Sequence, residues 1–254
     1  MPNPMKDAIA RGTPQFGVSV MFPSPQIVEM LAYAGFDWVL LDCEHGSIGL
    51  GDLELMAMAA DAAGITPIAR PTSNAAADIQ AVMDRGVKGV QVPHVTSRAV
   101  AERAVASVKF RAGGRSLAAG TRPDRWGLGG RMPDFVAQAN ADSLVCVQIE
   151  DREAVENIDE ILETPDVDVF FIGPSDLSQS YGFPGDPKAP PVAEAIAASL
   201  ARIRDAGRAP GMPAATEAVA GAVAAGCLYI YTHLPRLLGA GSGQFLEAAR
   251  GDFR

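Results

Sequence analysis

Short apolar runs alternate along this chain with longer segments in which apolar residues recur at helical spacing. Runs such as "WVLL" and "VFFI" lack the alternation of apolar and polar residues that marks a sheet with one solvent-exposed face. They are typical of parallel strands covered on both faces. The pattern predicts strands at residues 16–20, 38–42, 66–70, 89–92, 144–149, 169–172, 209–212 and 228–232.

The segments between these runs carry the start and stop signals of helices. Ser24 precedes Pro25 at one expected start, and glycines such as Gly35, Gly64 and Gly86 stand where helices should end. The pattern predicts helices at residues 24–34, 51–63, 74–85, 97–109, 153–162, 192–206, 216–225 and 237–249. The glycine-containing segment 111–133 is too long for a simple connection, so we expect a loop over one mouth of the fold, followed by a short helix at 133–140.

Eight strands and eight helices in strict alternation over 254 residues predict a single-domain (β/α)8 barrel, or TIM barrel, of the α/β class. A doubly wound open sheet is the main competitor. That fold usually has fewer strands and a glycine-rich turn after the first, and "MFPSP" is not such a turn.

The amino-acid composition excludes some classes of binding partner and indicates the compartment of the protein. The formal net charge of −9 argues against nucleic acid or an acidic membrane as a partner, because both need a basic surface. Three cysteines, an odd number, fit a reduced chain better than a disulfide framework. No stretch approaches the roughly 20 apolar residues of a membrane span, and the amino terminus has no apolar signal region. We therefore expect a cytoplasmic protein.

Polar side chains follow four of the predicted strands. In a (β/α)8 barrel, catalytic groups sit at the carboxyl ends of the strands, where the βα loops open. A single such residue would be read as a solvated loop charge, but four strand ends together indicate an active site. The residues are Asp42, Glu44 and His45 at the end of the second strand, Arg70 at the end of the third, Gln148 and Glu150 at the end of the fifth, and Gly173, Pro174, Ser175 and Asp176 at the end of the sixth.

Two of these carboxylates are candidate metal ligands. Glu150 and Asp176 come from neighbouring strands and have no Cys–His pair beside them, so oxygen ligands for a hard ion such as Mg²⁺ or Mn²⁺ are favoured, with a pair of solvated carboxylates as the alternative. His94, Tyr231 and His233 are interpreted as rim residues, and Cys43 as an inert packing thiol.

Several motifs together resemble one known family. "GFDWVLLDCEHG", "PIARP", "DRGVKGVQVPHV", "VQIEDREAVENIDEIL" and "VFFIGPSDLSQSYGFPG" occur in order from about residue 16 to 211 and resemble the HpcH/HpaI family of metal-dependent pyruvate aldolases. The resemblance implies a (β/α)8 barrel in a hexamer of dimers that exchange the last helix, near residues 237–249. It also implies a carbon–carbon lyase that reversibly cleaves 4-hydroxy-2-oxo acids to pyruvate and an aldehyde, with Mg²⁺ or Mn²⁺ and Co²⁺ as a further candidate.

The same resemblance implies roles for individual residues. Glu150 and Asp176 would hold the metal, with Gln148 beside them, and Arg70 would face the keto acid. His45 would be the acid–base residue, oriented by Asp42, while Asp84 would reach the site of a neighbouring subunit. The residues that would offer backbone to the pyruvate carboxylate are Gly173, Pro174 and Ser175.

Two regions depart from the commoner family pattern, namely "RAGGRSLAAG" after residue 110 and "YTHLPR" after residue 230. Both are expected to line the mouth where the aldehyde binds, which leaves the aldehyde open. One alternative is an acyl-CoA lyase of the citryl- or malyl-CoA type. The other is a non-catalytic barrel that binds a keto acid. The cations available for CoA phosphates would be Arg111, Arg115, Arg122 and Arg125.

Overall fold

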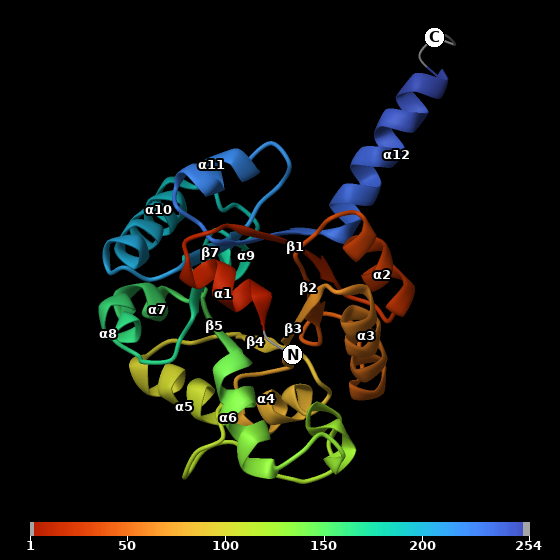
Figure 1. The fold of residues 1–254 in the computed structure, drawn as a ribbon. Helices are drawn as coiled ribbons and strands as arrows, with labels where there is room; N and C mark the ends of the chain where they lie inside the picture. The colour runs from red at the N-terminus through yellow and green to blue at the C-terminus, as the bar shows by residue number, and fades with distance from the viewer. Residues whose placement is uncertain (1–2, 251–254) are drawn as a thin grey trace.

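Eight parallel strands close into a barrel surrounded by helices in the computed structural model, which describes residues 3–250 (Figure 1). The strands are hydrogen-bonded in chain order from β1 to β8, and β1 pairs with β8. Their bounds are β1 Gln15–Val20, β2 Trp38–Asp42, β3 Thr66–Arg70, β4 Gly89–Val92, β5 Leu144–Ile149, β6 Val169–Ile172, β7 Pro210–Pro213 and β8 Tyr229–His233.

The helices lie around the barrel. They are α1 Pro4–Ala10, α2 Pro25–Tyr33, α3 Leu50–Ala63, α4 Ala76–Met83, α5 Arg98–Val108, the 3₁₀ helix η1 Arg122–Gly127, α6 Met132–Asp142, α7 Arg152–Glu156, α8 Ile158–Leu162, α9 Pro174–Ser180, α10 Pro190–Asp205, α11 Val219–Ala224 and α12 Leu234–Arg250. The predicted (β/α)8 barrel is confirmed.

The predicted elements differ from the observed ones in a few places. Strand β1 begins one residue earlier than expected, and β7 and β8 each run one residue later. The helix expected at 153–162 is interrupted at Asn157, whose φ of −95° and ψ of 10° separate α7 from α8. The sequence pattern did not predict α1, η1 or α9, which are short helices of seven, six and seven residues.

Large side chains fill the inside of the barrel. Trp38 and Tyr229 are fully buried with ring centroids 4.1 Å apart, and Phe171 meets Tyr229 edge to face. Gly17 on β1 makes room for this packing, because a Cβ at that position would lie 2.4 Å from the Trp38 ring. The centre of the barrel is therefore a packed core, as is usual for this fold.

Helix α1 covers the amino end of the barrel. Its Met5 and Ile9 join the cluster of interior side chains. Asn3, at the helix start, donates hydrogen bonds to the carbonyls of Lys88 and Asp142, at 3.1 and 2.9 Å. Helix α1 therefore closes the amino end of the barrel.

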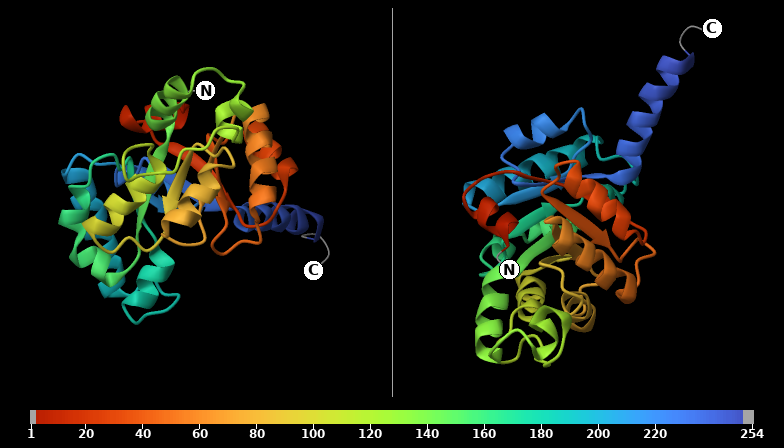
Figure 2. Two further views of the ribbon diagram at one scale, coloured as in Figure 1. Left: turned by 90° about the horizontal axis from the view of Figure 1, so that it is seen from below. Right: turned by 45° about the vertical axis from the view of Figure 1, so that its right-hand side comes forward.

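Helix α12 projects away from the barrel (Figures 1 and 2). Its residues from Leu238 onward are exposed, and they include the large apolar side chains Leu238, Phe245 and Leu246. Among the described residues, no helix combines the length and the apolar character needed to cross a membrane.

Candidate active site at the carboxyl ends of the strands

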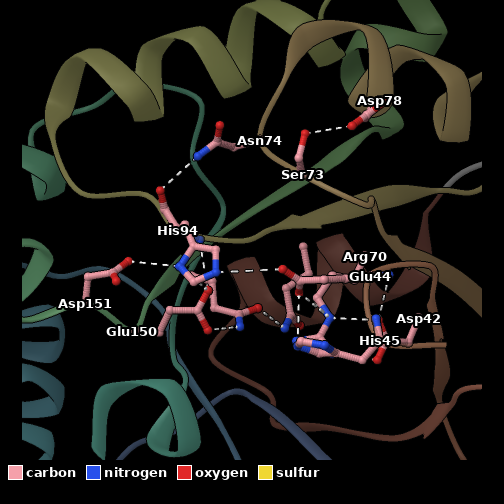
Figure 3. A network of polar contacts seen from close by, with 12 residues as sticks. Asp42, Glu44, His45, Arg70, Ser73, Asn74, Asp78, His94, Glu150 and Asp151 are labelled. Carbon is pink, nitrogen blue, oxygen red and sulfur yellow. Dashed lines mark hydrogen bonds and ion pairs between the residues drawn. The ribbon is translucent and has the colours of Figure 1, made fainter. Parts of the chain in front are cut away.

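Charged side chains from the ends of β2, β3 and β5 meet in the mouth of the barrel (Figure 3), and Asp176, which follows β6, lies close enough for its charge to act on Glu150. Asp42 ends β2, Arg70 ends β3, Glu150 directly follows β5, and Asp176 lies in the first turn of α9 after β6. The structure therefore brings together charged groups from the four strand ends that the sequence indicated. Asp84, whose role was implied by the family resemblance, lies at the end of α4.

Asp42 and Arg70 form a buried ion pair with two parallel hydrogen bonds. The guanidinium Nε lies 2.9 Å from Oδ1 of Asp42, and both residues are almost inaccessible to solvent. Oδ1 of Asp42 also accepts the backbone N–H groups of Glu44 and His45. Burial alone would lower the pKa of Arg70, but the hydrogen bond and charge of Asp42 hold this pKa above its usual value. Arg70 is thus a fixed, permanent cation.

Asp42 orients His45 through the main chain and not through the ring. The carboxylate nearest to the His45 ring belongs to Glu44, at 3.7 Å from Nε2. Glu44 also lies 3.2 Å from Nε of Arg70 and 3.8 Å from Nε2 of His94. Burial raises the pKa of Glu44, although the charge of Arg70 opposes this shift. Glu44, which had no role from sequence, therefore links the two histidines to Arg70.

Glu150 is a buried carboxylate with a donor at each oxygen. Oε1 accepts the backbone N–H of His94 at 2.9 Å, and Oε2 accepts the side-chain amide of Gln148. Burial raises the pKa of Glu150 to about 7 despite these two donors, and the nearby charge of Asp176 adds to the rise. A carboxylate in such surroundings is stabilised by a cation placed against it.

Gly173 allows this arrangement because it has no side chain. A Cβ at this position would lie 2.6 Å from Oε2 of Glu150 and 2.9 Å from its Cβ. The next residue, Pro174, begins α9, which carries Asp176 in its first turn while Ser175 is exposed. The strand end and the start of α9 can therefore approach Glu150 closely.

The donor set fits a hard divalent cation. Within residues 3–250 there is no cluster of three or more His, Cys, Asp or Glu side chains arranged to hold a metal. Two carboxylates, Glu150 and Asp176, are what an ion such as Mg²⁺ or Mn²⁺ needs from protein when water and substrate complete its shell.

His94 occupies a more central place than the rim position expected from sequence. Its Nδ1 lies 3.1 Å from Asp151 and 3.6 Å from Glu150, and its φ is +53°. Asn74 was expected to begin a helix, but it donates a hydrogen bond to the His94 carbonyl. Burial alone would lower the pKa of His94, but the hydrogen bond to Asp151 and the charge of Glu150 raise it. The sequence signal for its place at this end of the barrel was its position after Pro93, at the end of the predicted strand 89–92.

Tyr231 and His233 continue the inward face of β8 towards the mouth. Tyr231 is buried and stacks on Phe171 at 5.3 Å, and His233 meets the Tyr231 ring edge to face. Burial and the charges of Arg236 and Arg70 lower the pKa of His233. Tyr231 and His233 therefore lie near Arg70, and the expectation that the "YTHLPR" region lines the aldehyde mouth stays a prediction.

The 111–131 segment lies at the opposite end of the barrel from its own chain's site, which corrects the expectation that it lines the aldehyde mouth. Arg115 pairs with Asp84 at the end of α4, and Arg122 pairs with Asp61 near the end of α3. These helix ends precede the starts of strands, so they belong to the amino end. Figure 2 shows η1 and α6 on the side away from α12. Asp84 is likewise far from its own chain's site, and its role towards a neighbouring subunit stays a prediction.

Comparison with known proteins agrees with this geometry. The family model described as HpcH/HpaI aldolase/citrate lyase matches residues 15–226. A 4-hydroxy-2-oxo-heptane-1,7-dioate aldolase of Salmonella dublin is 38% identical over 225 residues, which cover 87% of this chain and 83% of the relative. The chain belongs to the HpcH/HpaI aldolase/citrate lyase family. The family resemblance and the enzyme class predicted from sequence, a carbon–carbon lyase, are confirmed.

Solved structures of family members superpose on the whole barrel. An HpcH/HpaI aldolase/citrate lyase family protein from Burkholderia cenocepacia J2315 has a TM-score of 0.92 at 29% identity, covering 98% of this chain and 99% of its own. The citrate synthase SbnG has a TM-score of 0.85 at 27% identity and covers 98% of both chains. The barrel of this chain is thus similar both to a protein of its own family and to a protein named as a citrate synthase.

Proposed function

We propose that this enzyme is a metal-dependent aldolase that reversibly cleaves a 4-hydroxy-2-oxo acid to pyruvate and an aldehyde. The observation that carries the proposal is the pairing, in one barrel mouth, of the buried carboxylate Glu150 with the fixed guanidinium of Arg70. A cation held at Glu150 and the Arg70 guanidinium would both face the oxygens of a bound 2-oxo acid.

The cation would be held by Glu150 and Asp176, and Mg²⁺ or Mn²⁺ suits their oxygen atoms. When bound, such an ion supplies Lewis-acid stabilisation of negative charge on the keto-acid oxygens. The backbone of Gly173, Pro174 and Ser175, at the start of α9, is available to orient the carboxylate of the substrate.

Arg70 stabilises the charge that grows on the C2 oxygen as the C3–C4 bond breaks. Its Nε and Nη2 are occupied by Asp42, so the guanidinium does not have to reorient during the reaction. A fixed donor of this kind is worth most in the transition state, where the charge is largest.

His45 removes the proton from the C4 hydroxyl of the substrate. Its ring is 53% exposed at the mouth and has the Glu44 carboxylate 3.7 Å from Nε2. An imidazole nitrogen can accept a proton and later return it, which is what a general base in a reversible reaction has to do. The reverse transfer returns the proton when pyruvate and the aldehyde condense.

The acyl-CoA lyase alternative depended on arginines after residue 110 that could bind the phosphates of CoA. Arg115 and Arg122, offered as partners for the CoA phosphates, are paired with Asp84 and Asp61 at the amino end of the barrel. These two cations therefore do not face the site of their own chain. The alternative is tested as well, because one protein of similar structure is a citrate synthase.

The assay for the proposed function measures pyruvate release from 4-hydroxy-2-oxo-heptane-1,7-dioate, the compound named for the Salmonella relative, and from shorter 4-hydroxy-2-oxo acids. We expect EDTA to abolish release and Mg²⁺, Mn²⁺ or Co²⁺ to restore it. Full activity in EDTA, or a borohydride-trapped adduct with pyruvate, would show a lysine enzyme instead. Cleavage of citryl- or malyl-CoA without pyruvate release would favour the alternative.

We also propose a cytoplasmic hexamer built from dimers that exchange α12. The apolar side chains of Leu238, Phe245 and Leu246 are exposed in the single chain, and a partner subunit would cover them. The three cysteines are free and buried, which suits a reducing compartment. Light scattering of the purified protein gives the mass; a monomer at micromolar concentration would contradict this assembly.

A further inference from the structure

A line of buried polar side chains crosses the inside of the barrel and ends at Glu150. The Tyr229 hydroxyl on β8 donates to Oε1 of Gln91 on β4 at 3.0 Å. The Gln91 amide donates to Oε1 of Gln148 on β5 at 2.5 Å, and the Gln148 amide donates to Oε2 of Glu150. These four side chains are at most 2% exposed, so solvent does not replace any of the three hydrogen bonds.

The chemistry of Tyr229 and Glu150, the two end members, fixes the direction in which the three hydrogen bonds are donated. An ionised carboxylate only accepts hydrogen bonds, so Gln148 must turn its NH₂ group towards Glu150. The carbonyl oxygen of Gln148 then faces Gln91 and needs a donor, which makes Gln91 turn its own NH₂ group the same way. The oxygen of Gln91 in turn needs a donor, and the Tyr229 O–H supplies it. The reverse direction would require a proton on Glu150.

We propose that Tyr229 and Gln91 are positioning residues that, acting through Gln148, hold the Glu150 carboxylate in the orientation in which it can bind the divalent cation. This inference rests on the proposed metal site. Without Gln91, the Gln148 amide loses the partner that fixes it and can rotate by half a turn. Its oxygen would then face the Glu150 carboxylate, and this repulsion would turn Glu150 away from the cation. Groups that orient a metal ligand in this way typically change metal affinity by about 10- to 100-fold.

The test uses full-length apoprotein and Mn²⁺ alone, titrated by calorimetry. We expect Gln91→Met, which keeps the length of the side chain but cannot hydrogen-bond, to raise the Kd for Mn²⁺ by about tenfold. Tyr229→Phe removes one oxygen atom, and about a threefold rise is expected. Both variants should approach the wild-type kcat for pyruvate release at saturating Mn²⁺, which a general packing defect would not allow. Cys146→Ala, at an inward position two residues before Gln148, is the matched packing control, with a Kd within twofold of wild type.

A double-mutant cycle decides whether the side chains act in series. If Tyr229 acts only through Gln91, adding Tyr229→Phe to Gln91→Met raises the Kd no further. Additive effects, or two folded single variants with the wild-type Kd, would overturn the proposal. Should Gln91→Met fail to fold, Tyr229→Phe alone still decides through its Kd. If the wild-type protein binds no Mn²⁺, the proposed metal site fails together with this inference. If the wild type binds Mn²⁺ and the variants bind it equally well, only this inference fails.

Discussion

Arg70 and Asp42 stand opposite each other at the ends of adjacent strands, with Nε 2.9 Å from Oδ1 and Nη2 2.5 Å from Oδ2. The two strands thus fix both groups by their register, and the carboxylate holds the guanidinium in one plane. This geometry makes Arg70 a rigid part of the site and gives its replacement a specific expected effect.

We expect Arg70→Ala to lower kcat for pyruvate release by at least about 10²-fold, the scale for losing one donor to a developing oxyanion. Arg70→Lys should rescue little of this loss, because an ammonium group cannot make two parallel bonds to Asp42 and hold the same position. Steady-state kinetics at saturating Mn²⁺ measures both variants. A change confined to KM would mean that Arg70 only binds the substrate.

Removing the carboxylate should destabilise the fold, because Arg70 would stay buried without its partner. We expect Asp42→Ala to lower the free energy of unfolding by about 3–5 kcal/mol. Urea titration in EDTA measures this effect without a contribution from metal. In the double variant Asp42→Ala with Arg70→Met, no unpaired charge is left, so much of the loss should be recovered. Equal stability of the single and double variants would show that the ion pair is not what matters there.

Gly173→Ala should weaken metal binding, because the added methyl group would lie 2.6 Å from Oε2 of Glu150. The carboxylate must move, and we expect the Kd for Mn²⁺ to rise at least about tenfold. Gly51→Ala is the matched control, since its added methyl group, in helix α3, meets nothing within 4 Å. It should leave the Kd unchanged and stabilise the helix by about 0.5–1 kcal/mol. Wild-type affinity in Gly173→Ala would show that Glu150 is not a ligand.

His45→Ala should lower the rate of aldol cleavage by about 10²- to 10⁴-fold if its ring is the general base. The metal affinity should stay close to that of the wild type, because the His45 ring lies against Glu44 and not against Glu150. Proton exchange at C3 of pyruvate, followed by nuclear magnetic resonance in deuterated water, gives a second measurement. If cleavage and exchange both continue at the wild-type rate, His45 has no part in proton transfer.

Strands and the residues at their ends were the predictable part of this protein. Buried runs such as "WVLL" are typical of strands covered on both faces, and the positions of Asp42, Arg70 and Glu150 follow from where those runs end. The topology of the barrel then places these residues at the carboxyl end of the strands, independently of the loop conformations.

Other parts depend on tertiary geometry that sequence patterns do not carry. Gln91 and Tyr229 look like ordinary members of apolar strands, and their hydrogen bond forms only because barrel closure brings β8 across from β4. His94 has a positive φ, a backbone conformation that could not be predicted from its residue type. The 111–131 segment was placed at the wrong end for its own chain because its contacts with Asp61 and Asp84 are long-range ion pairs.

Lys109 gives the fold a pH dependence that is separate from the active site. Its Nζ donates to the carbonyls of Asn140 and Ser143 at 2.7 and 2.8 Å, and the residue is buried. Burial, with the charge of Lys6 adding to it, lowers the pKa of Lys109 from 10.5 to about 8. Between these two values the unfolded chain holds a proton that the folded protein has released, so the free energy of unfolding rises as the pH increases through this window.

We therefore expect the wild type to gain stability from this group between pH 7.5 and 9.5, by about 2 kcal/mol at most. Lys109→Met cannot titrate, so its stability should lack this increase. Urea unfolding of both proteins across the window measures the difference, in which the other titrating groups cancel. Parallel curves for the two proteins would mean that Lys109 keeps an ordinary pKa in the folded state. A wild-type curve that falls relative to the variant would mean that its carbonyl partners stabilise the charged form more than burial destabilises it.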